Sequence, residues 1–72
     1  MDSTVKSNIS WYVHIPATQP LPLYELGIQL LELEGFHVKH YPKEKEAVAR
    51  VNRRNVGRVI DLLKDNGVTF WG

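Results

Sequence analysis

Apolar and polar side chains alternate in three stretches of the chain, and this is the pattern of half-buried β-strands. The stretches cover residues 9–15, 36–41 and 46–52. The charged segment 42–45 begins with proline, which predicts a turn that joins the second and third strands into a hairpin. Residues 68–71 (Val-Thr-Phe-Trp) have the composition of a further short strand, so we expect four strands.

Residues 23–34 have the 3.6-residue repeat of an amphipathic helix, with leucines on one face and glutamates opposite. Pro22 suits its first turn, and Gly35 suits the left-handed position after its end. Gly27 lies within the apolar face. An internal glycine lowers the stability of a helix by about 1 kcal/mol, so we expect packing to compensate for it. Since glycine has no side chain, Gly27 would let the helix backbone approach the sheet closely.

A second amphipathic helix is predicted for residues 53–65, with Asn52 as its N-cap and Asn66-Gly67 as its end. The three-prolyl segment 16–22 separates the first strand from the first helix, because proline lacks a backbone donor. The buried stripe of the second helix is expected to contain Val56, Val59, Ile60 and Leu63.

The order strand, helix, strand, strand, helix, strand predicts an α+β fold with a four-stranded antiparallel sheet and both helices on one face. One domain is expected over residues 9–72, after a polar and flexible N-terminus at 1–8. The predicted buried set is Trp11, Val13, Ile15, Leu26, Leu30, Phe36, Val38, Val51, Val59, Ile60, Leu63 and Phe70.

This pattern resembles the ferredoxin-like βαββαβ fold and, within it, the small ACT-like regulatory domains. The residues that carry the resemblance are the strand ending at Ile15, the Leu-rich residues 23–35, and the run 59–68 (Val-Ile-Asp-Leu-Leu-Lys-Asp-Asn-Gly-Val). The resemblance implies a small-ligand regulatory domain that acts as a dimer. ACT domains usually present glycine where the first helix begins, whereas this chain has Pro20-Leu-Pro22.

The chain has 72 residues, a formal net charge of +1 and no cysteine. The length allows one small domain, and the absence of cysteine excludes disulfides and thiolate chemistry. No apolar run approaches the roughly 20 residues of a membrane-spanning helix. The N-terminus lacks the apolar core of a signal peptide. We therefore expect a cytoplasmic protein without a membrane partner.

Three histidines, His14, His37 and His40, raise the question of a metal site. Strand positions three apart face opposite sides, so His37 and His40 cannot converge on one ion. We predict no metal, with His40 partly buried and the other two solvated. No catalytic motif is present, and Asp61 and Asp65 are like-charged neighbours on an exposed helix face. The chain is thus predicted to be non-enzymatic, without a cofactor.

Arg53 and Arg54 lie where the second helix begins, in a stretch rich in basic residues. A helix N-terminus with nearby arginines favours an anion, so these two residues are candidates for contact with an anion or a nucleic acid. Alternatively, Arg53 or Arg54 pairs with Glu32 or Glu34, which should lie at the same end of the sheet.

The sheet face without helices is the candidate functional surface, because aromatic and arginine side chains dominate binding hot spots. Hairpin pairing should place His37 opposite Arg50 and Lys39 opposite Val48. Trp71 should lie near Ser10 and Tyr12. The face should also display Thr69. The predicted partner-binding residues are Tyr12, His14, His37, Lys39, Tyr41, Arg50 and Trp71.

Three functions remain open, two from this surface and one from the resemblance to ACT domains. The first is a non-enzymatic regulatory protein that binds a protein partner, or a second copy of itself, through the sheet face. Its size would suit an inhibitor of a host or partner enzyme, such as those made by phages. The second is an RNA- or single-stranded-DNA-binding module, although the third strand supplies Val48 and Arg50 where RNA-recognition motifs have rings. The third is the ACT-like ligand-binding domain.

Overall fold

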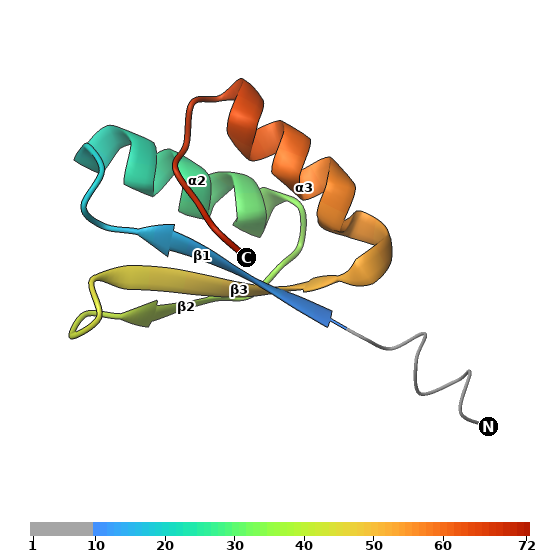
Figure 1. The fold of residues 1–72 in the computed structure, drawn as a ribbon, viewed down its shortest axis with the longest axis horizontal. Helices are drawn as coiled ribbons and strands as arrows, with labels where there is room; N and C mark the ends of the chain where they lie inside the picture. The colour runs from blue at the N-terminus through green and yellow to red at the C-terminus, as the bar shows by residue number, and fades with distance from the viewer. Residues whose placement is uncertain (1–9) are drawn as a thin grey trace.

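Three strands and two helices form two layers in the computed structural model, which describes residues 10–72. The strands make one sheet, and both helices lie on the same side of it (Figure 1). The predicted flexible N-terminus, residues 1–8, and Ile9 lie outside the described residues. The elements in chain order are β1 (Ser10–Pro16), α2 (Leu21–Leu33), β2 (Val38–Tyr41), β3 (Glu46–Asn52) and α3 (Arg53–Asp65).

The sheet has the order β1-β3-β2, and both pairings are antiparallel. The predicted register of the hairpin is confirmed where Lys39 pairs with Val48. Along the central strand β3, Ala47, Ala49 and Val51 are fully buried beneath the helices, while Val48 and Arg50 face the other side. The alternation predicted for residues 46–52 is therefore confirmed.

Both helices end in the same hydrogen-bonded motif, in which glycine takes a left-handed conformation. After α2, Gly35 has φ +91°, and the N–H of Phe36 donates to the carbonyl oxygen of Leu31 (3.0 Å). After α3, Gly67 has φ +74°, and the N–H of Val68 donates to the carbonyl oxygen of Leu63 (3.0 Å). The motif turns the chain back towards the sheet. A strand was predicted to begin at Phe36. Because Phe36 takes part in this motif, β2 begins only at Val38.

The helix starts are less conventional than the ends. α2 begins at Leu21, with proline in its first turn as predicted. Asn52 stands at the N-cap position of α3, but its side chain makes no capping hydrogen bond, so only its position was predicted correctly. The backbone of Asn52 is still part of β3, where it pairs with Ser10. α3 therefore follows the central strand without an intervening loop.

Gly27 lies where α2 crosses closest to its neighbours. A β-carbon built at this position would lie 2.8 Å from Val68 Cγ1 and 3.0 Å from Ile15 Cδ1, which is closer than carbon atoms pack. Ile15 belongs to β1, so the close approach of helix backbone to sheet that the sequence predicted is confirmed.

The buried core agrees with much of the predicted set and differs at the helix and sheet ends. Val13, Ile15, Val38, Val51, Val59 and Leu63 are buried, and Leu26, Leu30, Phe36, Ile60 and Phe70 are partly buried. Leu31 is also buried, whereas Leu33, which was predicted on the same face, is 74% exposed. At about 100° per residue, Leu33 is turned some 120° away from Gly27, so it points away from the sheet.

Trp11 was predicted to be buried, and this was wrong: it is 48% exposed. Its neighbours at the helix-facing positions of β1, Val13 and Ile15, are buried as predicted. Trp11 lies nearer the start of β1 than His14, the residue at which the C-terminal segment pairs with this strand. At this end of the sheet the indole ring keeps about half of its surface in solvent.

The predicted fourth strand at residues 68–71 is absent, and a single bridge takes its place. The N–H of His14 donates to the carbonyl oxygen of Trp71 (2.7 Å), and the N–H of Trp71 donates to that of His14 (2.9 Å). The next hydrogen-bonded pair of an antiparallel ladder would join Pro16 to Thr69. Proline has no N–H to donate, so this pair could form at most one of its two hydrogen bonds.

The side chain of Gln19 replaces the missing backbone partner. Its Nε2 donates to the carbonyl oxygens of Pro16 (2.8 Å) and Thr69 (3.0 Å). Its Oε1 accepts a hydrogen bond from the N–H of Thr69 (2.9 Å). The C-terminal segment is thus held beside β1 by one backbone bridge and one amide side chain, and Figure 1 shows it ending against this strand.

Replacing Gln19 by alanine is expected to loosen the C-terminal segment and to lower the free energy of unfolding by about 1 kcal/mol. The loss is modest because Thr69 is exposed and water can replace its partner. Amide hydrogen exchange of Trp71 should become faster while that of Ala49 in β3 changes little. Thr18→Ala, at an exposed neighbouring position, is the matched control. Unchanged exchange at Trp71 would contradict the bracing role of Gln19.

Candidate interaction face

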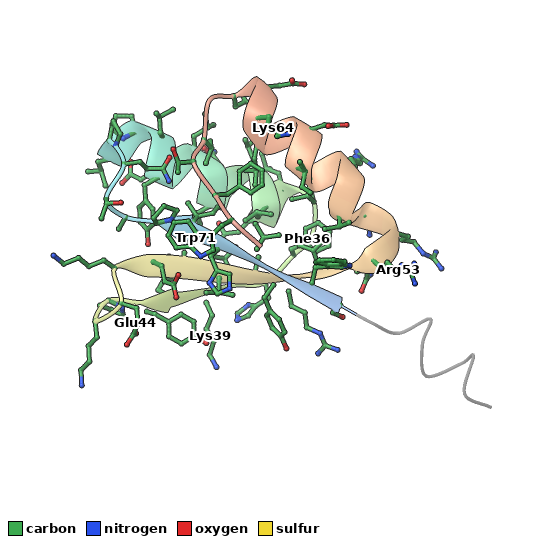
Figure 2. The ribbon with its side chains drawn as sticks, in the orientation of Figure 1. Phe36, Lys39, Glu44, Arg53, Lys64 and Trp71 are labelled. Carbon is green, nitrogen blue, oxygen red and sulfur yellow. The ribbon has the colours of Figure 1, made fainter. Side chains whose placement is uncertain are left out.

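The side of the sheet opposite the helices is not covered by a helix in the described part of the chain (Figure 1). Lys39 projects from this side, away from α2 and α3 (Figure 2). Alternation along the strands places Tyr12 and His14 of β1 here, with Val48 and Arg50 of β3 and Tyr41 of β2. We call this surface the open face.

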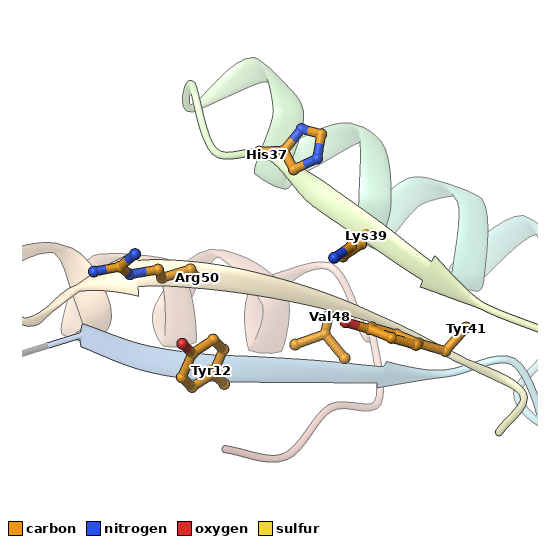
Figure 3. Close-up of a pocket in the computed structure, with 6 residues that line it drawn as sticks. All are labelled: Tyr12, His37, Lys39, Tyr41, Val48 and Arg50. Atoms are coloured by element: carbon orange, nitrogen blue, oxygen red, sulfur yellow. The ribbon is translucent and has the colours of Figure 1, made fainter.

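One end of the open face forms a hollow of about 330 Å³, which we call the basic hollow. All three strands contribute to it, and His37 reaches it from just before β2 (Figure 3). Its lining contains cationic and aromatic side chains and no carboxylate. The lining residues are Tyr12, His37, Lys39, Tyr41, Val48 and Arg50.

Arg50 is held in place without an acidic partner in the part of the chain that the structure describes. Its Nε donates to Ser10 Oγ on the neighbouring strand (3.1 Å), which leaves the two terminal nitrogens of the guanidinium free of that contact. The ion pairs among residues 10–72 join other residues: His14 with Glu46, and Arg58 with Glu34. The positive charge of Arg50 is therefore available to a ligand.

The other end of the open face forms a hollow of about 570 Å³, which we call the acidic hollow. It shares Tyr12, Tyr41 and Val48 with the basic hollow and adds carboxylates in place of cations. The lining residues are Tyr12, His14, Tyr41, Glu44, Glu46 and Val48. The open face thus has an aromatic and apolar centre between a basic end and an acidic end.

His14 links this face to the C-terminal segment. Its Nδ1 lies 3.1 Å from Glu46 Oε1, and since an ionised carboxylate only accepts hydrogen bonds, Nδ1 carries the proton. The imidazole also stacks on the indole of Trp71, with ring centroids 6.3 Å apart and an interplanar angle of 15°. Trp71 was predicted near Ser10 and Tyr12. In the structure Trp71 pairs with His14, and Gln19 holds Thr69 level with Pro16.

The other histidines lie apart from His14. His37 lines the basic hollow. His40 lies on the edge strand β2, where it pairs with Ala47 of β3. The prediction that His40 is partly buried was wrong: it is exposed, because only Val38 at the start of β2 is covered by the helices. No cluster of three or more metal-ligating side chains occurs within residues 10–72.

The two arginines at the start of α3 lie outside both hollows. Arg53 and Arg54 are exposed, and Figure 2 shows Arg53 at the end of the molecule where α3 begins. The predicted ion pair between one of them and Glu32 or Glu34 was wrong. Glu34 is bonded instead by Arg58 (Nη2 to Oε1, 3.2 Å), which lies more than one helical turn further along α3. Contact of Arg53 or Arg54 with an anion stays a prediction.

The open face gathers six of the seven predicted partner-binding residues in its two hollows, and Trp71 borders them through His14. Sequence reasoning did not include the acidic residues Glu44 and Glu46. The alternation of Glu46, Val48 and Arg50 could have revealed Glu46, because it puts all three on one side of β3.

No protein-family model matches the chain, and comparison with curated proteins and with solved structures gives no significant match. Neither helix in the described part is long and apolar enough to cross a membrane. What bears on function is therefore the chemistry of the open face itself.

Proposed function

We propose that this chain is a non-enzymatic interaction protein that binds a protein partner through the open face. The observation that carries the proposal is the group of large exposed side chains there: Tyr12 is 55% exposed, Tyr41 37% and Trp71 50%. Rigid aromatic side chains bury a large area on binding at little entropic cost. Arg50 adds a cation that has no acidic partner within residues 10–72, and tyrosine, tryptophan and arginine are the residues enriched in binding hot spots.

We infer that the fold is of the ferredoxin-like βαββαβ type. The strand order β1-β3-β2 and the position of both helices on one face support this inference. The bridge between His14 and Trp71 puts the C-terminal segment on the outer edge of β1, where the fourth strand of that fold would lie. This fold serves many unrelated functions, so it does not by itself indicate which one this chain has. The choice between them rests on the side chains of the open face.

The open face supports a protein partner better than a nucleic acid. The acidic hollow contains Glu44 and Glu46, which would repel phosphates that follow the strand past the basic hollow. The central strand β3 presents no aromatic ring on this face, so bases would lack half of a stacking platform. A partner protein whose surface has mixed charge and an apolar centre would not be repelled by these carboxylates and would not need a ring on β3.

Substitutions on the open face are expected to weaken partner binding while the fold persists. The tagged chain, used as bait in an extract of its source cells, should lose its partner on Arg50→Ala or Trp71→Ala, with affinity lower by more than about 1 kcal/mol for each. The backbone bridge of Trp71 does not need its side chain. Circular dichroism should show that both variants remain folded.

The matched controls lie on the helical side, where Gln29→Lys and Glu32→Lys change charge at exposed positions of α2. Both controls should retain the partner. Loss of the partner in the helix variants with retention in the sheet variants would overturn the proposal. Capture of nucleic acid in place of protein, with affinity falling steeply as salt is added, would support the alternative of a nucleic-acid-binding module.

A further inference from the structure

The positive charges of the basic hollow have no counter-charge in the described part of the chain. Lys39 and Arg50 form no ion pair within residues 10–72, and the lining of the hollow contains no acidic residue. The acidic end of the open face differs, because Glu46 already accepts a hydrogen bond from His14 (3.1 Å). What the open face still lacks is therefore an anion at the basic hollow.

Arg50 has the geometry to bind a carboxylate. Its Nε donates to Ser10 Oγ (3.1 Å), and this contact orients the guanidinium while its two terminal nitrogens remain available. Those two nitrogens can donate together to the two oxygen atoms of one carboxylate. Lys39 is level with Val48, the second residue before Arg50 on β3. It is thus a diagonal neighbour of Arg50, and its long side chain can reach the same carboxylate.

Apolar surface lies directly beside these cations. Tyr12 is level with Arg50 on the neighbouring strand and is 55% exposed. Val48 lies about 7 Å from Arg50 along β3, and Figure 3 shows all three side chains in the same hollow. A small free anion would leave this apolar surface in water. An acidic side chain that has an apolar neighbour in the same segment would cover it, and burying that area favours binding.

A carboxylate fits this hollow better than a phosphate. Phosphate sites commonly use backbone N–H groups aimed at the ligand. The backbone of β3 is hydrogen-bonded to strands on both sides, within the plane of the sheet. Above the central strand the hollow therefore offers an anion side chains only. A chain of phosphates would also meet Glu44 and Glu46 in the acidic hollow.

We propose that the basic hollow binds an acidic side chain of the partner protein, held by Arg50 and Lys39. An apolar side chain of the same segment then lies on Tyr12 and Val48. This inference rests on the proposed function, because it states what the partner presents to the open face. Short peptides with an acidic residue close to an apolar one should therefore bind this chain.

A selection from random linear peptides displayed on phage tests this without knowledge of the partner. The immobilised full chain should enrich peptides in which aspartate or glutamate lies within a few residues of an apolar or aromatic residue. Arg50→Glu should abolish the preference for acidic residues and enrich basic ones, because it reverses the charge of the hollow. Arg53→Glu is the matched control. It changes the net charge equally at an exposed position outside both hollows, and it should keep the acidic preference.

The most enriched peptide, made synthetically, locates the contact. In nuclear magnetic resonance titrations it should shift the amide signals of Lys39, Val48 and Arg50 and leave that of Lys64 on α3 unchanged. Replacing its acidic residue by the matching amide should weaken binding about tenfold or more, because a charged hydrogen-bond acceptor is lost. Inorganic phosphate at the same concentration and ionic strength should not shift these signals.

Circular dichroism must show that Arg50→Glu is folded. If it is not, Lys39→Glu decides, since Lys39 is an exposed residue of the edge strand β2, and it should weaken binding of the same peptide. The proposal is overturned if nothing is enriched, if the enriched peptides lack acidic residues, or if Arg50→Glu retains the acidic preference. Stronger shifts with inorganic phosphate than with the peptide would also overturn it, by assigning the hollow to phosphate.

This inference and the proposed function fail separately. A partner lost on Trp71→Ala, together with enriched peptides that are apolar without an acidic residue, overturns the bound carboxylate and leaves the proposed function standing. A partner lost on Glu32→Lys and retained on Arg50→Ala and Trp71→Ala, with a peptide that shifts amide signals of α2 instead of Val48, overturns both.

Discussion

Leu63→Ala is expected to lower the free energy of unfolding by about 2–5 kcal/mol. Leu63 is 0% exposed and lies on the last turn of α3, where its carbonyl oxygen also accepts the hydrogen bond that turns the chain back at Val68. Removing its side chain leaves a cavity that the sheet and helices can close only in part. A domain of this length has a small margin of stability, so the variant should be partly unfolded at room temperature.

Urea denaturation followed by circular dichroism measures this loss, and Leu33→Ala provides the matched control. Leu33 is the same residue type at the end of the other helix, but it is exposed, so its replacement should change stability by less than about 0.5 kcal/mol. Equal effects of the two substitutions would show that the side chain of Leu63 does not carry the core.

Gly27→Ala is expected to destabilise the domain by up to about 2 kcal/mol, although alanine is the better helix former. The gain in helix propensity is about 1 kcal/mol. The substitution also overpacks the core, because the new methyl group would lie 2.8 Å from Val68 Cγ1 and 3.0 Å from Ile15 Cδ1. Overpacking typically costs about 1–3 kcal/mol. Ile15 is fully buried in the sheet, so it has little room to move.

The same substitution at Gly57 should have the opposite sign. Gly57 lies within α3, and a β-carbon built there meets no atom within 4 Å. Gly57→Ala should therefore stabilise the domain by up to about 1 kcal/mol through helix propensity alone. Thermal unfolding of the two variants beside the wild type measures the contrast. A stabilising effect at both positions would mean that α2 does not pack against β1 as closely as described.

Local patterns were enough to predict most elements of this fold. Residues 46–52 and 53–65 form β3 and α3 with the predicted bounds, because alternation, helical repeat and terminal glycines are signals within a few residues of one another. The prediction of a fourth strand was wrong, and the reason lies in contacts between residues far apart in the sequence. Whether residues 68–71 could extend a ladder depends on the register that sets Thr69 opposite Pro16, and on Gln19, fifty residues away in the chain.

The composition of the open face was also largely predictable, since alternation assigns each strand residue to one side once the strand is known. The distribution of charge on that face was not. It depends on a contact of the folded chain, in which Glu46 accepts a hydrogen bond from His14 across strands. Away from that face, the pairing of Glu34 with Arg58, which leaves Arg53 and Arg54 exposed, was not predicted either. Distances between elements decided these partners, and the sequence alone does not contain them.

The way in which the C-terminal segment is held also affects how the sheet avoids aggregation. The outer edge of β1 would otherwise present a row of free N–H and C=O groups, and such an edge is a template for strands of other molecules. Pro16 removes one donor from that row, and Gln19 occupies the carbonyl oxygen beside it, while Trp71 covers His14. An incoming strand would have to displace an amide side chain and a backbone bridge before it could add to the sheet. A side chain and a proline thus protect an edge that no complete strand from residues 10–72 covers.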